Sequence, residues 1–257
     1  AGGSAAGHAD RVIRSHAMAW FPTPLQAKHV NPQRHVQLNV KVYAGRYEEY
    51  IVCQVNSGIF DDVLRESQLR ATDPQLVIVD MGANIGLATL YLQAFAAKVV
   101  AVEPLSPHYD AITDMIRVFG LHHVVAVRAA VVAETGSGFV NFWRDAQNPT
   151  GSALASLKPD GDTDNVYQVP ALTPRMVLAL HGLTRVDLLK LDIEGGEEMI
   201  LDQLAELDIG CIHMECHFAG CLEAAKAAWR GKLELVSKSE FGTVQDDSLW
   251  CTPHNPT

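Results

Sequence analysis

Long apolar runs are absent from this sequence. No run approaches the roughly 20 residues that a helix needs to cross a bilayer, so we expect no membrane span. The opening residues, AGGSAAGHADRV, also lack the hydrophobic core of a secretory signal. These absences favour a cytoplasmic protein, although a location in an organelle stays open because a transit peptide is not readable from this chain.

Basic residues are also scarce. Twenty Lys and Arg side chains face thirty Asp and Glu side chains, which gives a formal net charge of −10. Phosphate backbones and anionic membrane surfaces bind proteins mainly through basic side chains. The charge therefore argues against nucleic acid or a membrane as the main partner and favours a small or neutral substrate.

Cysteine is the third scarce residue type. The sequence has five, an odd number without the spacing of a disulfide framework. We therefore expect reduced thiols in an intracellular protein, and no disulfides. The gaps between Cys211, Cys216 and Cys221 do not match a zinc motif, so buried free thiols are the simpler interpretation.

The chain is long and apolar enough to bury a large core. With 257 residues, 48% of them hydrophobic, it is most simply one large domain, or one domain with an added segment. Residues 36–55 have the pattern of two strands around a turn at Gly45, and residues 58–70 have helical spacing. With the flexible Gly/Ala/Ser-rich start, they predict an N-terminal extension over 1–70 and a main domain over 71–257.

Strands and helices alternate through the main domain. Strand patterns occupy 76–80, 98–103, 123–131, 186–192 and 209–216, and helical patterns occupy 85–97, 107–119 and stretches that begin near 174, 195 and 220. This alternation predicts a parallel sheet with right-handed crossovers and helices on both faces. The last two strands, at 232–237 and 248–253, have no helix between them and predict an antiparallel edge hairpin.

The first strand-to-helix turn, DMGANIG at 80–86, differs from a dinucleotide-binding loop. In open parallel sheets, ligands lie at the carboxyl ends of the strands, where glycines let them approach the backbone. Gly82 and Gly86 remove side chains from this turn, and Asn84 offers an amide. Asp80 precedes the glycines, and a carboxylate suits a ligand with a cationic amine better than a pyrophosphate.

Glu103 ends the second strand of the main domain. At that position a carboxylate can accept hydrogen bonds from both hydroxyls of a ribose. A nucleoside that carries an amino acid satisfies both Glu103 and the acidic glycine turn, so the sequence predicts S-adenosylmethionine as the cofactor. A dinucleotide, or a turn that serves packing alone, is the weaker alternative.

A second group of acids follows the strand at 186–192. Asp192 ends that strand, where it can orient the cofactor or the substrate, and Glu194 points from the next loop toward an acceptor. The alternative is that these acids cap the following helix, whose dipole favours negative charge at its start. Glu197 and Glu198 are expected to form a solvated first turn of that helix.

The fifth strand supplies the other half of the expected site. Alternation along IHMECH places Glu215 and His217 on one face, near the cleft. We expect His217 to act as a general base, because imidazole titrates near neutral pH and a neighbouring carboxylate raises its basicity; a structural histidine is the alternative. Asp192, Glu215 and His217 could also converge on a divalent cation, but the spacing of a closed site is absent and we expect no metal.

Four motifs in order, VDMGANIG at 79–86, VEP at 102–104, LLKLDIEGGE at 188–197 and MECH at 214–217, resemble the FkbM family of S-adenosylmethionine-dependent methyltransferases. The resemblance runs from about residue 58 to residue 253. It implies a Rossmann-like α/β fold of the class I methyltransferases, with a seven-stranded, mostly parallel sheet and one antiparallel strand. It also implies O-methylation of a hydroxyl on a sugar, a glycolipid or a natural product.

The residues and the resemblance together select the site. Candidate cofactor-binding residues are Asp80, Gly82, Ala83, Asn84, Gly86, Glu103, Pro104, Ala130 and Asp192. Candidate catalytic residues are Asp192, Glu194, Glu215 and His217. The chain departs from the family at Val132 and Ala133, where a Ser-Asp pair is common, and at Arg175, where an acid is frequent.

A polar passage rich in Gly, Pro and Asp interrupts the alternation at 144–165. It predicts a loop or lid over the acceptor, with Asn148 and Ser152 as candidate contacts, and an ordinary connecting loop is the alternative. Two other functions stay open: an NAD-type oxidoreductase, and a catalytically silent module that binds S-adenosylmethionine.

Overall fold

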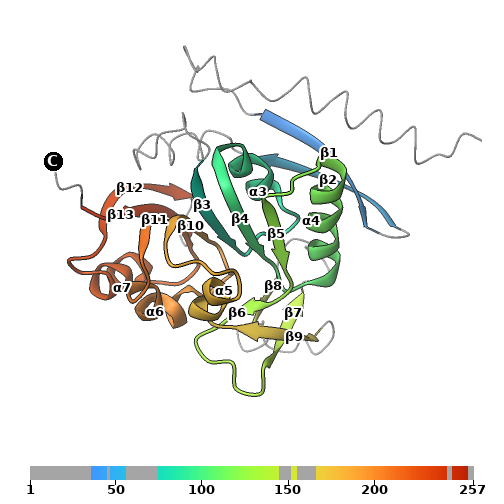
Figure 1. Cartoon of the computed structure of the whole chain (residues 1–257). Helices are drawn as coiled ribbons and strands as arrows, with labels where there is room; N and C mark the ends of the chain where they lie inside the picture. The colour runs from blue at the N-terminus through green and yellow to red at the C-terminus, as the bar shows by residue number, and fades with distance from the viewer. Residues whose placement is uncertain are drawn as a thin grey trace, which may run out of the picture.

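The main sheet has seven strands in the order β12-β13-β11-β10-β3-β4-β5 (Figure 1). The computed structural model describes residues 36–44, 47–55, 75–144, 152–154, 166–241 and 245–253. The strands of the main sheet are β3 (Leu76–Met81), β4 (Ala96–Val102), β5 (Val124–Val127), β10 (Val186–Leu191), β11 (Ile209–Cys216), β12 (Glu234–Phe241) and β13 (Gln245–Cys251).

The strand order confirms the predicted topology. β3 pairs in parallel with β4 on one side and with β10 on the other. β13 is antiparallel to both of its neighbours, β11 and β12, and it lies between them. The fold is therefore the predicted α/β, Rossmann-like arrangement with one reversed strand and a terminal hairpin.

Helices cover both faces of this sheet. They are α3 (Leu87–Leu92), η1 (Gln93–Phe95), α4 (Ser106–Phe119), α5 (Pro174–Leu180), η3 (Glu197–Ile200), α6 (Leu201–Ala205) and α7 (Cys221–Ala228). Alternate strand residues point to opposite faces, so Val79 packs with α5, α6 and α7 while Ile78 packs with α3. In Figure 1, α5, α6 and α7 gather below the sheet, apart from α3 and α4.

Two predicted elements are shorter than expected. The helix predicted over 85–97 begins only at Leu87, because Gly86 has a left-handed backbone (φ 87°) at the N-cap, and residues 96 and 97 already belong to β4. The strand predicted over 123–131 divides into β5 and β6 (Ala130–Val131). β6 leaves the main sheet because it pairs with β9 (Val166–Leu172) instead of with β4.

A second sheet, in the order β6-β9-β7-β8, was not predicted. Its other strands are β7 (Phe139–Arg144) and β8 (Ser152–Leu154), so the passage at 144–165 is in part a strand rather than only a loop or lid. β7 pairs antiparallel with β9 from Phe139 to Trp143. The polar composition of the passage concealed this pairing, which joins segments more than 20 residues apart.

The described part of the N-terminal extension is a hairpin of β1 (Val36–Ala44) and β2 (Tyr47–Val55), paired antiparallel as predicted. The helix predicted over 58–70 lies outside the described residues. None of the helices in the described ranges has the length and apolar character required to cross a lipid bilayer.

The expectation of reduced cysteines is wrong. Cys211 of β11 and Cys251 of β13 form a disulfide, with Cα atoms 4.1 Å apart, and a second disulfide joins Cys216 to Cys221 at the start of α7. Cys211 and Cys251 are 40 residues apart in sequence and become cross-strand partners only because β13 returns beside β11. These disulfides also remove the argument from reduced thiols for an intracellular location.

Removing the two disulfides separately should destabilise the protein by different amounts. A cross-link stabilises mainly by restricting the unfolded chain, and the effect grows with the length of the closed loop, so the Cys211→Ala/Cys251→Ala pair should cost about 4 kcal/mol and the Cys216→Ala/Cys221→Ala pair about 2 kcal/mol. Urea unfolding of the oxidised proteins measures both. Peptide mapping without reductant should recover the two linked pairs, and free thiols at these four positions would contradict the assignment.

Candidate active site

A pocket opens at the carboxyl ends of β3, β4 and β10. Its lining residues are Gly82, Asn84, Val102, Glu103, Pro104, His108, Ala129, Ala130, Val131, Phe142, Asp192, Ile193, Glu194 and Gly196. Seven of the predicted site residues are among them: Gly82, Asn84, Glu103, Pro104, Ala130, Asp192 and Glu194. The structure thus brings the predicted cofactor turn and the first acids after β10 to one place.

The glycine turn passes directly against the end of β10. Gly82 has a left-handed backbone (φ 81°), and a Cβ atom there would lie 1.7 Å from the carbonyl oxygen of Asp192. The Asp192 N–H donates to the Met81 carbonyl at 3.0 Å, which holds the two chain segments together. Ala83 and Gly86 lie in the same turn but pack against Ile112 of α4 rather than lining the pocket.

The carboxylate of Glu103 is held from two sides. Its Oε2 accepts the Asn84 N–H at 2.9 Å, and its Oε1 accepts the Leu105 N–H at 3.0 Å. The Nδ1 of His108 lies 3.4 Å from Oε1. Because each oxygen has a second lone pair, the fixed carboxylate can still accept hydrogen bonds from a ligand in the pocket.

Beneath the turn, the ammonium of Lys190 joins three oxygens. Its Nζ lies 3.1 Å from the Gly82 carbonyl, 3.1 Å from Asp192 Oδ2 and 3.4 Å from Asp80 Oδ1. Burial by itself lowers the pKa of Lys190, but the charges of Asp192 and Asp80 outweigh burial and raise it. Lys190 therefore remains charged, and it was missed at the sequence level although a lysine inside the apolar run LLKLD was a usable signal.

Asp80 supports the turn and does not line the pocket. It is fully buried, and its Oδ2 accepts a hydrogen bond from the Thr89 hydroxyl at 2.6 Å. Its other oxygen faces the ammonium group of Lys190, so the negative charge of Asp80 is balanced by a charge within the protein. The predicted contact between Asp80 and the amine of a ligand stays a prediction.

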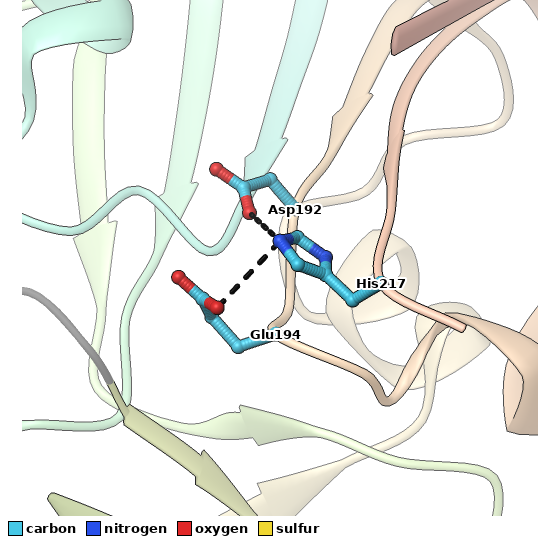
Figure 2. Close-up of side chains that lie close together, drawn as sticks. All are labelled: Asp192, Glu194 and His217. Atoms are coloured by element: carbon cyan, nitrogen blue, oxygen red, sulfur yellow. Dashed lines mark ion pairs between the residues drawn. The ribbon is translucent and has the colours of Figure 1, made fainter. Parts of the chain in front are cut away.

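On the other side of Asp192, the His217 side chain lies among carboxylates. Its Nδ1 is 3.1 Å from Glu197 Oε1. Its Nε2 faces Glu215 Oε1 at 3.5 Å, Glu194 Oε2 at 3.6 Å and Asp192 Oδ1 at 4.0 Å. Figure 2 shows Asp192 and Glu194 turned toward the same ring nitrogen. Since Glu215 faces that nitrogen as well, all four predicted catalytic residues come together.

Glu197 is not the solvated residue that was predicted. It is fully buried, and its carboxylate accepts the backbone N–H groups of Ile193 and Gly195, both at 3.0 Å. Left-handed backbone at Glu194 (φ 57°) and Gly195 (φ 94°) folds the loop over this carboxylate. Glu198 is exposed, as predicted.

The carboxylates change the protonation of the cluster. Burial lowers the pKa of His217, but hydrogen bonds to Glu197 and Glu215 outweigh burial and raise it to about 11. With that pKa the imidazole carries a proton at neutral pH, so the role of general base stays a prediction that requires His217 to give up this proton first. Burial and the charge of Asp192 raise the pKa of Glu194 to about 7.

The two acceptor contacts, Asn148 and Ser152, stay predictions. Asn148 lies outside the described residues, and Ser152 lies in β8, where it pairs with Arg144 in the strand register. Phe142 of β7 lines the pocket and was missed, because the second sheet that carries it was not predicted. Val132, at the position where the family commonly has Ser, packs with Phe142 in a small apolar core.

Comparison with known sequences decides the family. Residues 80–234 match the pattern of the Methyltransferase FkbM domain, which is more than half of the chain. The chain belongs to the FkbM methyltransferase family. The matched region is therefore an S-adenosylmethionine-dependent methyltransferase domain, and the NAD-dependent alternative is wrong.

Other relatives of this FkbM methyltransferase are distant. The AMB antimetabolite synthetase AmbE of Pseudomonas aeruginosa is 27% identical over 77% of the chain, and the chain spans only about a tenth of its length. The METTL16 methyltransferase domain has a TM-score of 0.51 at 10% identity, covering 79% of this chain and 70% of that one. Methyltransferase FkbM from Methylobacillus flagellatus has a TM-score of 0.49 at 14% identity, covering 72% and 45%. The METTL16 likeness shows the shared fold alone.

The pocket of the FkbM methyltransferase fits S-adenosylmethionine. The buried Oδ1 of Asn84 has no hydrogen-bond partner within the described chain and can accept one from the cofactor. Gly82 lines the pocket, where the lack of a side chain lets its turn lie against Asp192, and Glu103 presents a fixed carboxylate. Asn84, Glu103 and the turn would hold the nucleoside and amino-acid ends.

Replacing Lys190 by methionine should destabilise this methyltransferase by about 3–5 kcal/mol, because it leaves the buried charge of Asp80 unpaired. Adding Asp80→Asn should recover at least about 1 kcal/mol, since the charge that needed Lys190 is then gone. Denaturant unfolding of the single and double variants gives this coupling. Lys226→Met, at an exposed ion pair on α7, is the matched control and should change stability by less than about 0.5 kcal/mol. Equal losses in the single and double variants would contradict the assigned pairing.

Proposed function

We propose that the protein transfers a methyl group from S-adenosylmethionine to a hydroxyl oxygen of a small acceptor such as a sugar, a glycolipid or a natural product. The observation that carries this proposal is the division of the pocket into two chemically different halves. Glu103 and the glycine turn form one half. Asp192 and Glu194 line the other half and form a cluster with His217 and Glu215, which are not among the lining residues.

The cofactor half of the site binds and orients S-adenosylmethionine. Glu103 accepts hydrogen bonds from the ribose hydroxyls, and its own position is set by the N–H groups of Asn84 and Leu105. Pro104 and Ala130 line the pocket next to Glu103, where small apolar groups suit a flat aromatic base. Phe142 adds a ring to the same wall.

The acid half faces the acceptor. S-adenosylmethionine supplies an electrophilic methyl group when it is bound. As the acceptor oxygen forms its bond to the methyl carbon, the carbon–sulfur bond breaks and the hydroxyl proton passes to a carboxylate of the cluster. Glu194 is the most exposed of these side chains, at 42%, and is the proposed proton acceptor. Positioning the hydroxyl at near-attack distance contributes further acceleration.

The charge of the site favours a small acceptor. Four carboxylates lie around His217, and the chain as a whole carries a net charge of −10. A polyanionic nucleic acid would be repelled by both. Residues 71–257 would form the catalytic domain and residues 1–70 an extension, with Asn148 and Ser152 proposed as acceptor contacts.

Replacing Glu103 by alanine should weaken the affinity for S-adenosylhomocysteine by about tenfold or more, because a buried, charged hydrogen-bond acceptor is lost. Calorimetry of the purified proteins measures the dissociation constants. Glu223→Ala, at an exposed side chain on α7, is the control and should bind like the unchanged protein. Equal affinity of the Glu103→Ala variant would remove Glu103 from the cofactor site.

Replacing Glu194 by glutamine should slow methyl transfer by about 10²-fold or more while it changes S-adenosylhomocysteine affinity little, since a positioned proton acceptor acts on the acceptor and not on the cofactor. A panel of hydroxylated acceptors, labelled methyl donor and mass spectrometry identify the substrate and then give the rates. Glu198→Gln, four residues along the chain and exposed, is the matched control. Methyl groups found on nitrogen or carbon would overturn the proposed O-methylation, and cofactor binding without transfer to any acceptor would indicate a silent binding module.

A further inference from the structure

The acid half of the site has the donor set of a cation site. Asp192, Glu194 and His217 each present one atom, and these atoms all lie within 4.8 Å of one another (Figure 2). We propose that Asp192, Glu194 and His217 bind a divalent cation of the Mn²⁺ type. Binding of the cation is independent of the methyl acceptor, whereas its part in catalysis rests on the proposed function.

The orientation of His217 is the observation that separates this site from a mere group of acids. The side chain is nine-tenths buried, and its Nδ1 is held by Glu197, which is itself fully buried. This leaves Nε2 directed at Glu215 Oε1, 3.5 Å away, and at Glu194 Oε2 and Asp192 Oδ1, whose distances of 3.6 Å and 4.0 Å are longer than a good hydrogen bond. A histidine fixed through one nitrogen by a carboxylate is the usual form of a histidine that binds metal through the other.

The neighbours of Asp192 select which of its oxygens is available. Lys190 takes Oδ2 at 3.1 Å, so Oδ1 is the atom that faces His217. Glu215 Oε1, 3.5 Å from Nε2, lies on the same side as a further donor. Four carboxylates, those of Asp192, Glu194, Glu197 and Glu215, thus lie around the imidazole, and a divalent cation at Nε2 would offset their negative charge.

The two separations from His217 Nε2 and the types of the donor atoms agree with a specific class of ion. On an octahedral cation with bonds of about 2.1 Å, neighbouring donors lie about 3.0 Å apart and opposite donors about 4.2 Å apart. The 3.6 Å and 4.0 Å distances from Nε2 to Glu194 and Asp192 fall between these values. Carboxylates suit Mg²⁺ and Mn²⁺, and the imidazole nitrogen shifts the preference toward Mn²⁺.

The position of the site indicates how the cation would contribute to methyl transfer. Asp192 and Glu194 line the pocket in which the methyl donor binds, so a cation between them and His217 would lie where the acceptor hydroxyl approaches. There it would orient the acceptor oxygen and stabilise the negative charge that develops as its proton leaves. Glu194 offers only one oxygen to the cation, so its other oxygen would still accept the proton, and no oxidant or reductant is needed.

The test uses the full chain, freed of metal with a chelator and then titrated with Mn²⁺. The electron paramagnetic resonance signal of free Mn²⁺ and calorimetry should both show a single tight site per chain. Glu194→Gln and His217→Gln should each weaken Mn²⁺ binding by about tenfold or more. Glu198→Gln, the same change at an exposed acid nearby, should leave Mn²⁺ affinity unchanged and so exclude general attraction to an acidic protein.

Two outcomes would overturn the cation site: absence of a stoichiometric site, or equal Mn²⁺ affinity in Glu194→Gln and Glu198→Gln. Glu194 is partly exposed, so Glu194→Gln decides the matter even if a change at the buried His217 prevents folding. S-adenosylhomocysteine binding, measured on the same samples, separates the two proposals. Intact cofactor binding without Mn²⁺ would refute the cation alone, whereas tight Mn²⁺ binding without methyl transfer to any acceptor would refute the proposed function and leave the cation site standing.

Discussion

The structure of the site depends on one buried ammonium group. Lys190 reaches from β10 to the carbonyl of Gly82 and to the carboxylates at the ends of β3 and β10. Two acids at adjacent strand ends would repel each other in a buried setting, and the lysine between them turns that repulsion into attraction. The glycine turn can then lie against β10 closely enough that even a methyl group would not fit.

A second buried charged residue, Glu197, organises the half of the site that contains His217. Glu197 accepts two backbone N–H groups of its own loop and holds His217, so one carboxylate shapes the loop after β10 and orients the residue that follows β11. Lys190 contacts Asp192, and Glu197 contacts His217. The residues that face the pocket are thus positioned by charged groups that do not line it, and the two halves meet at Asp192.

Much of this arrangement could be predicted from local patterns. The strand order followed from alternation of strands and helices, and Glu103 and the glycine turn followed from their places at strand ends. Lys190, Glu197 and the Cys211–Cys251 disulfide could not be predicted in the same way, because their roles are defined by partners far away in sequence or by a loop whose path was unknown. Phe142 was hidden for the same reason, since its strand pairs with residues beyond a long polar passage. Local spacing also indicated which acids gather after β10. It did not indicate that Glu197 is buried whereas Glu198 is exposed.

The Cys216–Cys221 disulfide closes a short ring of chain that contains His217. A flexible loop loses conformational freedom when a ligand orders it, and that loss subtracts from affinity. Here the backbone around His217 is already confined by a covalent bond, together with the anchoring of its ring by Glu197. The imidazole therefore becomes ordered when the protein folds and the disulfide forms, not when a ligand binds. A ligand that contacts His217 does not have to order this part of the site.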